Sequence, residues 1–150
     1  MTAKTVDQPE ALAQLIARLE ALEPDTRRRW GTLTPGAMLC HLADAASSAL
    51  EQGSDPGRRR PLLRWIGLYA PFPWPRGFKA PQRFDPQVDG TRPGDFEEDR
   101  AWAIGTLRAI ASAPDDAFRP SHYVFGAMRP RDWRRWAYRH THHHLRQFGL

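Results

Sequence analysis

The chain has 150 residues and a formal net charge of +5, from 22 Lys and Arg against 17 Asp and Glu. Its 41% hydrophobic and 26% charged content is that of a soluble globular protein. The length is typical of one domain over residues 1–150, and the single cysteine, Cys40, excludes an internal disulfide framework.

Four segments are predicted to form helices, and the first two lie in the N-terminal third of the chain. In the first, apolar residues recur at three- and four-residue steps from Leu12 to Leu22, and Pro24 ends the helix. The second opens at Thr34, a favourable N-cap residue, and Gly53 lies near its end.

The third and fourth helices occupy the C-terminal half. Asp95 is the expected N-cap of the third, Glu98 follows at capping-box spacing, and Pro114 lies just beyond its end. The fourth begins at Pro130 and ends close to Gly149. The expected buried faces carry Met38, Leu42, Ala45 and Ala49 on the second helix, Phe96, Ala103, Leu107 and Ile110 on the third, and Trp133, Trp136 and Ala137 on the fourth.

Residues 54–93 connect the second and third helices, and residues 62–69 within them are expected to form a short extra helix. A structureless connection of this length is unusual in a compact domain, so aromatic residues are expected to pin it to the helices. These are Phe72, Trp74, Phe78 and Phe84. No run shows strand alternation. The predicted fold class is therefore all-α, most simply a four-helix bundle with one long, Pro-rich crossover between helices two and three.

Arginine supplies most of the positive charge, in runs at 27–29 and 58–60 and along the last segment. Nucleic-acid binding is one interpretation and a solvated surface is the other. No nucleic-acid-binding motif accompanies the charge, so the solvated surface is favoured and nucleic acid is disfavoured as a partner. No secretory signal or membrane span is found, and we expect a cytoplasmic protein without a membrane partner.

The placement of the histidines is the most informative feature of the sequence. His140 and His144 are four residues apart, so on a helix they share one face, one turn apart. That face continues the apolar stripe of the fourth helix, and His41 lies on the core-facing side of the second. Three imidazoles from two helices can hold a divalent metal ion and leave its fourth position open, as in catalytic zinc sites.

Spacing alone leaves alternatives open. His143 competes with His144, because His140 and His143 also share a face. His142 lies about 200° around the helix from His140 and is expected to be exposed and non-ligating. Core histidines without a metal are another interpretation. No Glu stands beside His140 as in the HExxH motif, and Cys40 is expected to be a buried, inert thiol.

Several segments match a known family. They are 29–34 (RWGTLT) followed by 38–41 (MLCH), 125–126 (FG), Trp133 and the terminal 138–149 (YRHTHHHLRQFG). On these residues the chain resembles the DinB-like, YfiT-like superfamily of metalloenzymes, and most closely a bacterial branch of unknown function. The match covers both ends of the chain and is loose from 54 to 94. Arg129 stands where a capping Thr or Ser is usual, which we expect to weaken that cap by about 1 kcal/mol, and His142 replaces an acidic residue.

The resemblance implies a four-helix bundle with a metal held by His41, His140 and His144, and it favours His144 over His143. Zinc is the first expectation for the metal and nickel the second. The resemblance also implies a homodimer. Some branches use a low-molecular-weight thiol cofactor, which comes to this chain by analogy only.

The expected function is a divalent-metal-dependent enzyme, either a hydrolase or a thiol-dependent transferase. Four further residues are candidates around the site: His122 and Tyr123 at the pocket mouth, Gln147 as a hydrogen-bond partner of an imidazole, and Trp30 as a pocket wall. A packing role is equally open for His122 and Tyr123 and is favoured for Trp30. The alternatives are a non-catalytic metal-binding or structural homodimer and a basic nucleic-acid-associated protein.

Overall fold

The computed structural model describes residues 3–53, 56–77, 79 and 81–150. These residues are mostly helical, which confirms the all-α class, and none of their helices is long and apolar enough to cross a membrane. The elements in chain order are α1 (Pro9–Glu20), α2 (Pro35–Ser48), α3 (Pro61–Tyr69), the 3₁₀ turn η1 (Gln82–Phe84), α4 (Phe96–Ser112), the 3₁₀ turn η2 (Asp115–Ala117), β1 (Ser121–His122), β2 (Gly126–Ala127) and α5 (Pro130–Gln147).

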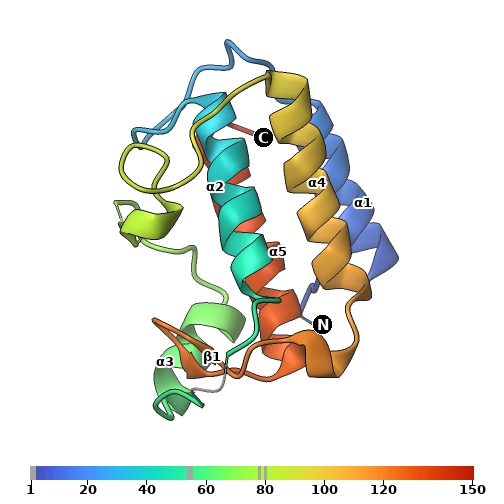
Figure 1. Ribbon diagram of the computed structural model, residues 1–150, viewed down its shortest axis with the longest axis vertical. Coiled ribbons are helices and arrows are strands. Elements are labelled where there is room, and N and C mark those ends of the chain that lie inside the picture. Colours follow the sequence, from blue (N-terminus) through green and yellow to red (C-terminus); the bar gives the residue numbers. More distant parts are fainter. Residues whose placement is uncertain (1–2, 54–55, 78, 80) are drawn as a thin grey trace.

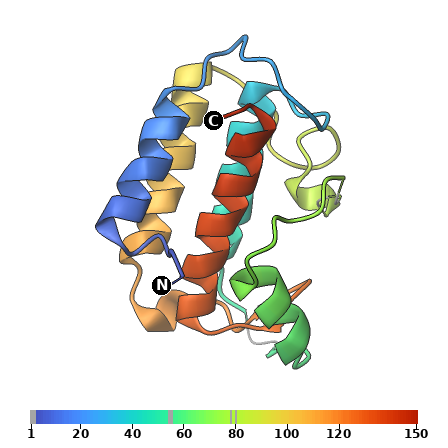
Figure 2. The same ribbon diagram turned by 180° about the vertical axis from the view of Figure 1, so that it is seen from behind.

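The four longer helices α1, α2, α4 and α5 lie alongside one another, and α3 sits at one end beside the strands (Figure 1). Seen from behind, α1 and α5 form the near face and cover α4 and α2 (Figure 2). The most extensive contact joins α2 to α4, while α5 contacts α1, α2 and α4. The histidine-rich helix α5 therefore packs directly against α2, which carries His41.

The core fills the space between these helices. Every apolar position expected on the inner faces of α2 and α5 is buried, and on α4 only Phe96 is half-buried. Helix α2 is buried on nearly all sides, because α4, α5 and η1 all pack against it. Alanines at positions 37, 43, 45 and 46 contribute to this packing, since small side chains let neighbouring helices approach closely.

The predicted caps of α2 and α4 are present. The Thr34 hydroxyl accepts a hydrogen bond from the backbone N–H of Ala37 at 3.2 Å. The Asp95 carboxylate accepts from the N–H groups of Glu97 and Glu98, each at 3.0 Å. Both caps satisfy donors that have no partner inside the helix. The second helix ends earlier than expected, at Ser48 rather than near Gly53.

At the start of α5, Arg129 makes no side-chain cap hydrogen bond, as expected, but Asp132 adds contacts that the sequence did not predict. The fully buried carboxylate of Asp132 accepts a hydrogen bond from the Arg129 backbone N–H at 3.0 Å. The same carboxylate accepts from the Arg129 guanidinium at 3.1 Å and from the Tyr69 hydroxyl at 2.5 Å. The Arg129 side chain has no acceptor for the first-turn N–H groups, but this carboxylate satisfies the N-cap N–H and ties α5 to α3.

One antiparallel strand pair was not predicted. Ser121 lies opposite Ala127 and His122 opposite Gly126. Strands of two residues are too short to show alternation in a sequence. Gly126 has a φ of +68°, and a side chain there would clash with the carbonyl oxygen of Arg58. Glycine is therefore required at this close backbone approach.

The long crossover is ordered around α3 and η1. As expected, Phe84 is buried and Trp74 is half-buried, with its indole N–H donating to the Gly67 carbonyl at 2.6 Å. The expectation that the Phe72 ring packs against the helices is wrong, because Phe72 is 70% exposed. Its backbone carbonyl, and not its ring, contacts α5, where it accepts a hydrogen bond from the Arg139 guanidinium. Phe78 lies outside the described residues.

Candidate metal centre

Three buried histidines meet where α2 packs against α5. They are His41, His140 and His144, with exposed fractions of 4%, 8% and 9%. The Nε2 atoms of His41 and His140 are 3.0 Å apart, and one ring nitrogen from each of the three residues can be chosen so that all lie within 4.8 Å of one another. The ring centroid of His144 lies 4.6 Å from that of His41 and 4.7 Å from that of His140.

Helix geometry explains this convergence. His140 and His144 project from the same face of α5 because four residues make about one turn. The same face places Trp136 one turn earlier, where its ring stacks on His140 with centroids 4.8 Å apart. His41 enters from α2, in the middle of that helix's buried surface.

Hydrogen bonds donated by Nδ1–H orient two of the three rings. The Nδ1–H of His41 donates to the carbonyl of Phe84 at 2.6 Å, and the Nδ1–H of His144 donates to the Oε1 of Gln147 at 2.7 Å. With Nδ1 protonated, the lone pair of a neutral imidazole is on Nε2. The Nε2 lone pair of His41 faces Nε2 of His140.

Burial keeps the three imidazoles neutral. Desolvation lowers the pKa of His41, although the Phe84 carbonyl acts in the opposite direction. Desolvation also holds the pKa values of His140 and His144 well below the ordinary value, and the neighbouring histidines lower them further. Neutral imidazole is the form that binds metal ions, so these side chains are in the ligating state at neutral pH.

The donor set fits a divalent cation. Tetrahedral coordination at 2.0–2.1 Å places neighbouring ligand nitrogens roughly 3.3 Å apart, close to the 3.0 Å between His41 and His140. Each oriented imidazole has a hydrogen-bond acceptor on its second nitrogen, as metal-bound histidines usually do. Three imidazoles suit zinc, nickel and related ions alike, so the ligands alone do not select one metal.

The two remaining histidines of α5 lie outside the cluster. The half-buried ring of His143 contacts Trp30, with centroids 5.0 Å apart, and Trp74, with centroids 5.8 Å apart. The expectation that His142 is exposed is wrong: it is half-buried, because α1 packs on this side of α5 and Arg18 donates a hydrogen bond to its Nδ1 at 2.9 Å.

His122 and Tyr123 do not reach the histidine cluster. His122 is buried and packs 5.5 Å from Trp136, which separates it from His140. Its Nδ1 accepts from the Val124 N–H at 3.1 Å, and burial lowers its pKa to about 3. The Tyr123 ring stacks on His122 and is 54% exposed. These contacts are those of a packed loop.

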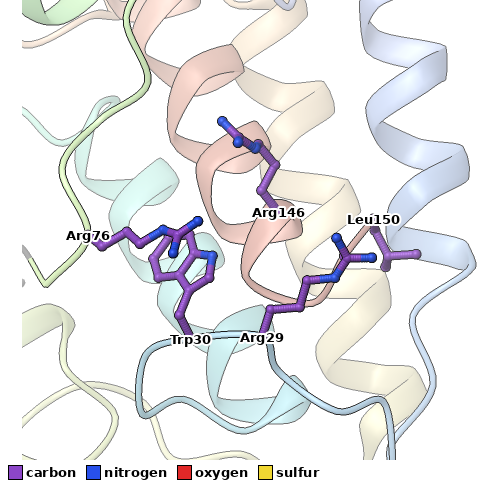
Figure 3. Close-up of a pocket in the computed structure, with 6 residues that line it drawn as sticks. Arg29, Trp30, Arg76, Arg146 and Leu150 are labelled. Atoms are coloured by element: carbon purple, nitrogen blue, oxygen red, sulfur yellow. The ribbon is translucent and has the colours of Figure 1, made fainter.

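Trp30 lines an open cavity of about 260 Å³ (Figure 3). The other lining residues are Arg29, Arg76, Arg146, Gly149 and Leu150. The Arg76 guanidinium lies over the Trp30 ring, 5.3 Å from its centroid. Among the described residues, no Asp or Glu forms a salt bridge with any of the three arginines. The cavity is therefore a cationic environment suited to a small anion.

The cavity and the histidine cluster share a wall. Trp30 contacts His143, whose ring lies 5.3 Å from that of His144. The backbone N–H of Arg29 donates to the backbone carbonyl of Gln147 at 2.6 Å. The loop that carries Arg29 and Trp30 therefore contacts the residue whose side chain orients His144. Sequence reasoning identified Trp30 and Gln147 but missed the arginines as a group, because they come from three distant segments.

Phe84 and Cys40 also adjoin His41, the first in space and the second in the sequence. Phe84 supplies a backbone carbonyl, an acceptor that no side-chain pattern indicates. Cys40 is fully buried next to His41 in the sequence, and burial together with the nearby Asp99 raises the pKa of its thiol to about 12. The thiol is inert at neutral pH, as expected.

Comparisons with family models, with curated proteins and with solved structures find no match to this chain.

Proposed function

We propose that this protein is a divalent-metal-dependent enzyme with His41, His140 and His144 as the metal ligands and one coordination position open to substrate or water. The observation that carries the proposal is the convergence of three buried, neutral imidazoles from two helices. Their separations suit one cation, and the acceptors Phe84 and Gln147 hold two of the rings in place. The segments described above also support membership of the DinB-like superfamily and its four-helix-bundle fold.

A bound metal would supply Lewis acidity and would lower the pKa of coordinated water toward about 7. The protein's own residues supply the rest. Gln147 fixes the His144 ring, and the carbonyl of Phe84 fixes the His41 ring. The indoles of Trp74 and Trp136 lie against the cluster and exclude water from one side. Hydrolysis and thiol-dependent transfer are the two reaction types proposed for this arrangement.

The neighbouring cavity favours an anionic substrate. A carboxylate or phosphate group can bind Arg29, Arg76 and Arg146, beside the wall of Trp30 and His143 that separates the cavity from His144.

Metal analysis tests the proposal directly. Purified protein is loaded with zinc or nickel, freed of excess metal by gel filtration, and analysed by mass spectrometry for bound metal. We expect one ion per chain in the wild type and loss of stable binding in His41→Ala and His140→Ala. His142→Ala is the matched control, because this half-buried histidine lies on the same helix but outside the cluster.

Equal metal content in all four proteins would show that the ion is not held at this site. If metal binds as expected but the loaded protein turns over no member of a panel of anionic esters, amides and thiol acceptors, the site is a non-catalytic metal-binding site.

A further inference from the structure

Helix α3 presents apolar side chains to solvent. Leu62, Trp65 and Ile66 are 71%, 57% and 47% exposed, and Leu63 is 41% exposed. The opposite side of the helix packs inward through Leu68, which is fully buried. Together with the exposed ring of Phe72, five large apolar residues lie open within one short stretch of chain. Single exposed apolar residues are ordinary, but four on one nine-residue helix, with a fifth three residues beyond its end, are typical of an interaction surface.

The same stretch carries positive charge only. Between Pro56 and Phe84 the sequence has seven Lys and Arg residues and no Asp or Glu. Three of them, Arg58, Arg59 and Arg60, directly precede α3 and are exposed. Asp132 packs under α3, but its carboxylate is fully buried and bonded to Arg129 and Tyr69, so it presents no charge at the surface.

The expectation of no membrane partner came from the lack of a spanning segment, which does not bear on binding at a membrane surface. We infer that this surface, the α3 face made of residues 58–60, 62, 63, 65, 66 and 72, binds the surface of a membrane that contains anionic lipids. An interfacial helix inserts Leu, Ile and Trp side chains into the boundary between headgroups and acyl chains. Adjacent arginines pair with anionic headgroups, and each contributes roughly a fivefold gain in partitioning. The α3 face has both components, and Trp65 is the residue type enriched at such boundaries.

The side chains of the α3 face argue against a second copy of the chain and against nucleic acid as the partner. A two-fold contact between two copies through this face would offer Arg58, Arg59 and Arg60 no acidic partner, because residues 56–84 of the other copy contain no Asp or Glu. Nucleic acid would satisfy the arginines, but its phosphates offer nothing to Leu62 and Ile66. A lipid surface satisfies the aliphatic and the cationic side chains together. The inference does not depend on the metal, since α3 contributes no ligand to the histidine cluster.

Vesicle co-sedimentation tests the inference. The full chain is mixed with phosphatidylcholine vesicles with and without phosphatidylglycerol, at low and moderate salt. We expect binding to the phosphatidylglycerol vesicles only, weakening as salt screens the charge. Trp65→Ser is expected to weaken partitioning about tenfold or more. The double variant Arg58→Gln/Arg59→Gln is expected to weaken it about 25-fold.

Two matched controls keep the test specific. Arg27→Gln/Arg28→Gln removes the same charge from the loop between α1 and α2, at the other end of the molecule from α3 (Figure 1). Trp102→Ser removes another exposed indole, on α4. Both controls are expected to bind vesicles like the wild type, and circular dichroism checks that every variant is folded.

Three outcomes would overturn the inference. One is that the wild type binds no phosphatidylglycerol vesicle at low salt. Another is that the control arginine variant weakens binding as much as the α3 variant, which would make the effect one of net charge. The third is that the wild type is a dimer that Trp65→Ser converts to a monomer, which would identify a second copy of the chain as the occupant of the α3 face.

Discussion

The three histidines of the cluster differ in the contacts that fix their rings. His41 and His144 each have Nδ1 bonded to an acceptor from another turn or another segment, the carbonyl of Phe84 and the side chain of Gln147. His140 is fixed instead by packing, between the parallel ring of Trp136 and the rings of the other two histidines. The cluster is therefore preorganised, which favours metal binding because few side-chain rotations must be frozen on binding.

Gln147 gives the most direct test at the scale of one residue. In Gln147→Leu the His144 ring loses its acceptor, and we expect metal affinity to fall about 10–100-fold, the range found for such supporting residues. Competition with a chelator of known affinity measures the change. Gln87→Leu, at an exposed position of the crossover, is the control and is expected to bind metal normally. Unchanged affinity in Gln147→Leu would show that this hydrogen bond does not support the site.

His122 makes the free energy of unfolding depend on pH. Burial lowers its pKa to about 3 in the folded chain, and Arg119 and Arg83 act in the same direction. The unfolded chain, with a histidine pKa of about 6.5, therefore takes up the proton first as the pH falls. The contribution of His122 to stability is complete above about pH 6.5 and is lost as the pH drops toward 3, with a slope of about 1.4 kcal/mol per pH unit.

Denaturant unfolding of the metal-free wild type and of His122→Asn between pH 7.5 and 5 measures the contribution of His122 as the difference between the two slopes, because the other buried histidines with a lowered pKa add to the slope of both proteins. His122→Asn keeps an acceptor for the Val124 N–H but does not titrate, so we expect a shallower pH dependence in this variant. A wild type whose stability is flat from pH 7 to 5 would contradict the prediction.

At the scale of the elements, Asp132 in the first turn of α5 holds this helix to α3. Burial acts to raise the pKa of Asp132, but hydrogen bonds from Arg129 and Tyr69 outweigh it and hold the pKa below its usual value. The carboxylate is thus charged, buried and bonded to two other elements. Asp95 caps α4 in a simpler way, at an exposed position and through backbone donors only.

These two caps are expected to differ in their contribution to stability. Asp132→Ala leaves the Tyr69 hydroxyl and the Arg129 N–H without their partner, and we expect a loss of about 3 kcal/mol. Asp95→Ala removes an exposed cap and is expected to cost about 1 kcal/mol. Urea unfolding of both variants measures the difference. Equal losses would mean that the connection from α5 to α3 contributes little.

At the scale of the whole molecule, distant segments bring cations to one place. Arg29 comes from the loop after α1, Arg76 from the crossover and Arg146 from the end of α5, and together they surround the cavity beside Trp30 (Figure 3). No acidic side chain among the described residues forms a salt bridge with any of them. Such an arrangement attracts small anions from solution.

Calorimetric titration with inorganic phosphate or succinate tests the cavity. We expect weak, salt-sensitive binding in the wild type and at least a fivefold loss in Arg29→Gln and Arg76→Gln. Arg108→Gln, on the exposed side of α4, is the control and is expected to bind like the wild type. Identical affinities in all four proteins would place the anion elsewhere, while the metal site would be unaffected by that result.

The sequence by itself determined the helical class, the caps at Thr34 and Asp95, the apolar faces and the three histidines that were expected to meet, because all of these follow from local periodicity and spacing. The choice of His144 over His143 came from the family resemblance. Only the tertiary structure decided the hydrogen bond from His41 to the Phe84 carbonyl, the half-burial of His142 beneath Arg18 and the strand pair at Gly126.

The sequence predicts features that depend on neighbouring residues and does not predict contacts between residues far apart in the chain. Periodicity along a helix reports which residues share a face, but not which remote backbone carbonyl or guanidinium will lie opposite that face. The cationic cavity and the exposed face of α3 depend on segments far apart in the chain and on surfaces left uncovered after packing, and both exist only once the helices have assembled.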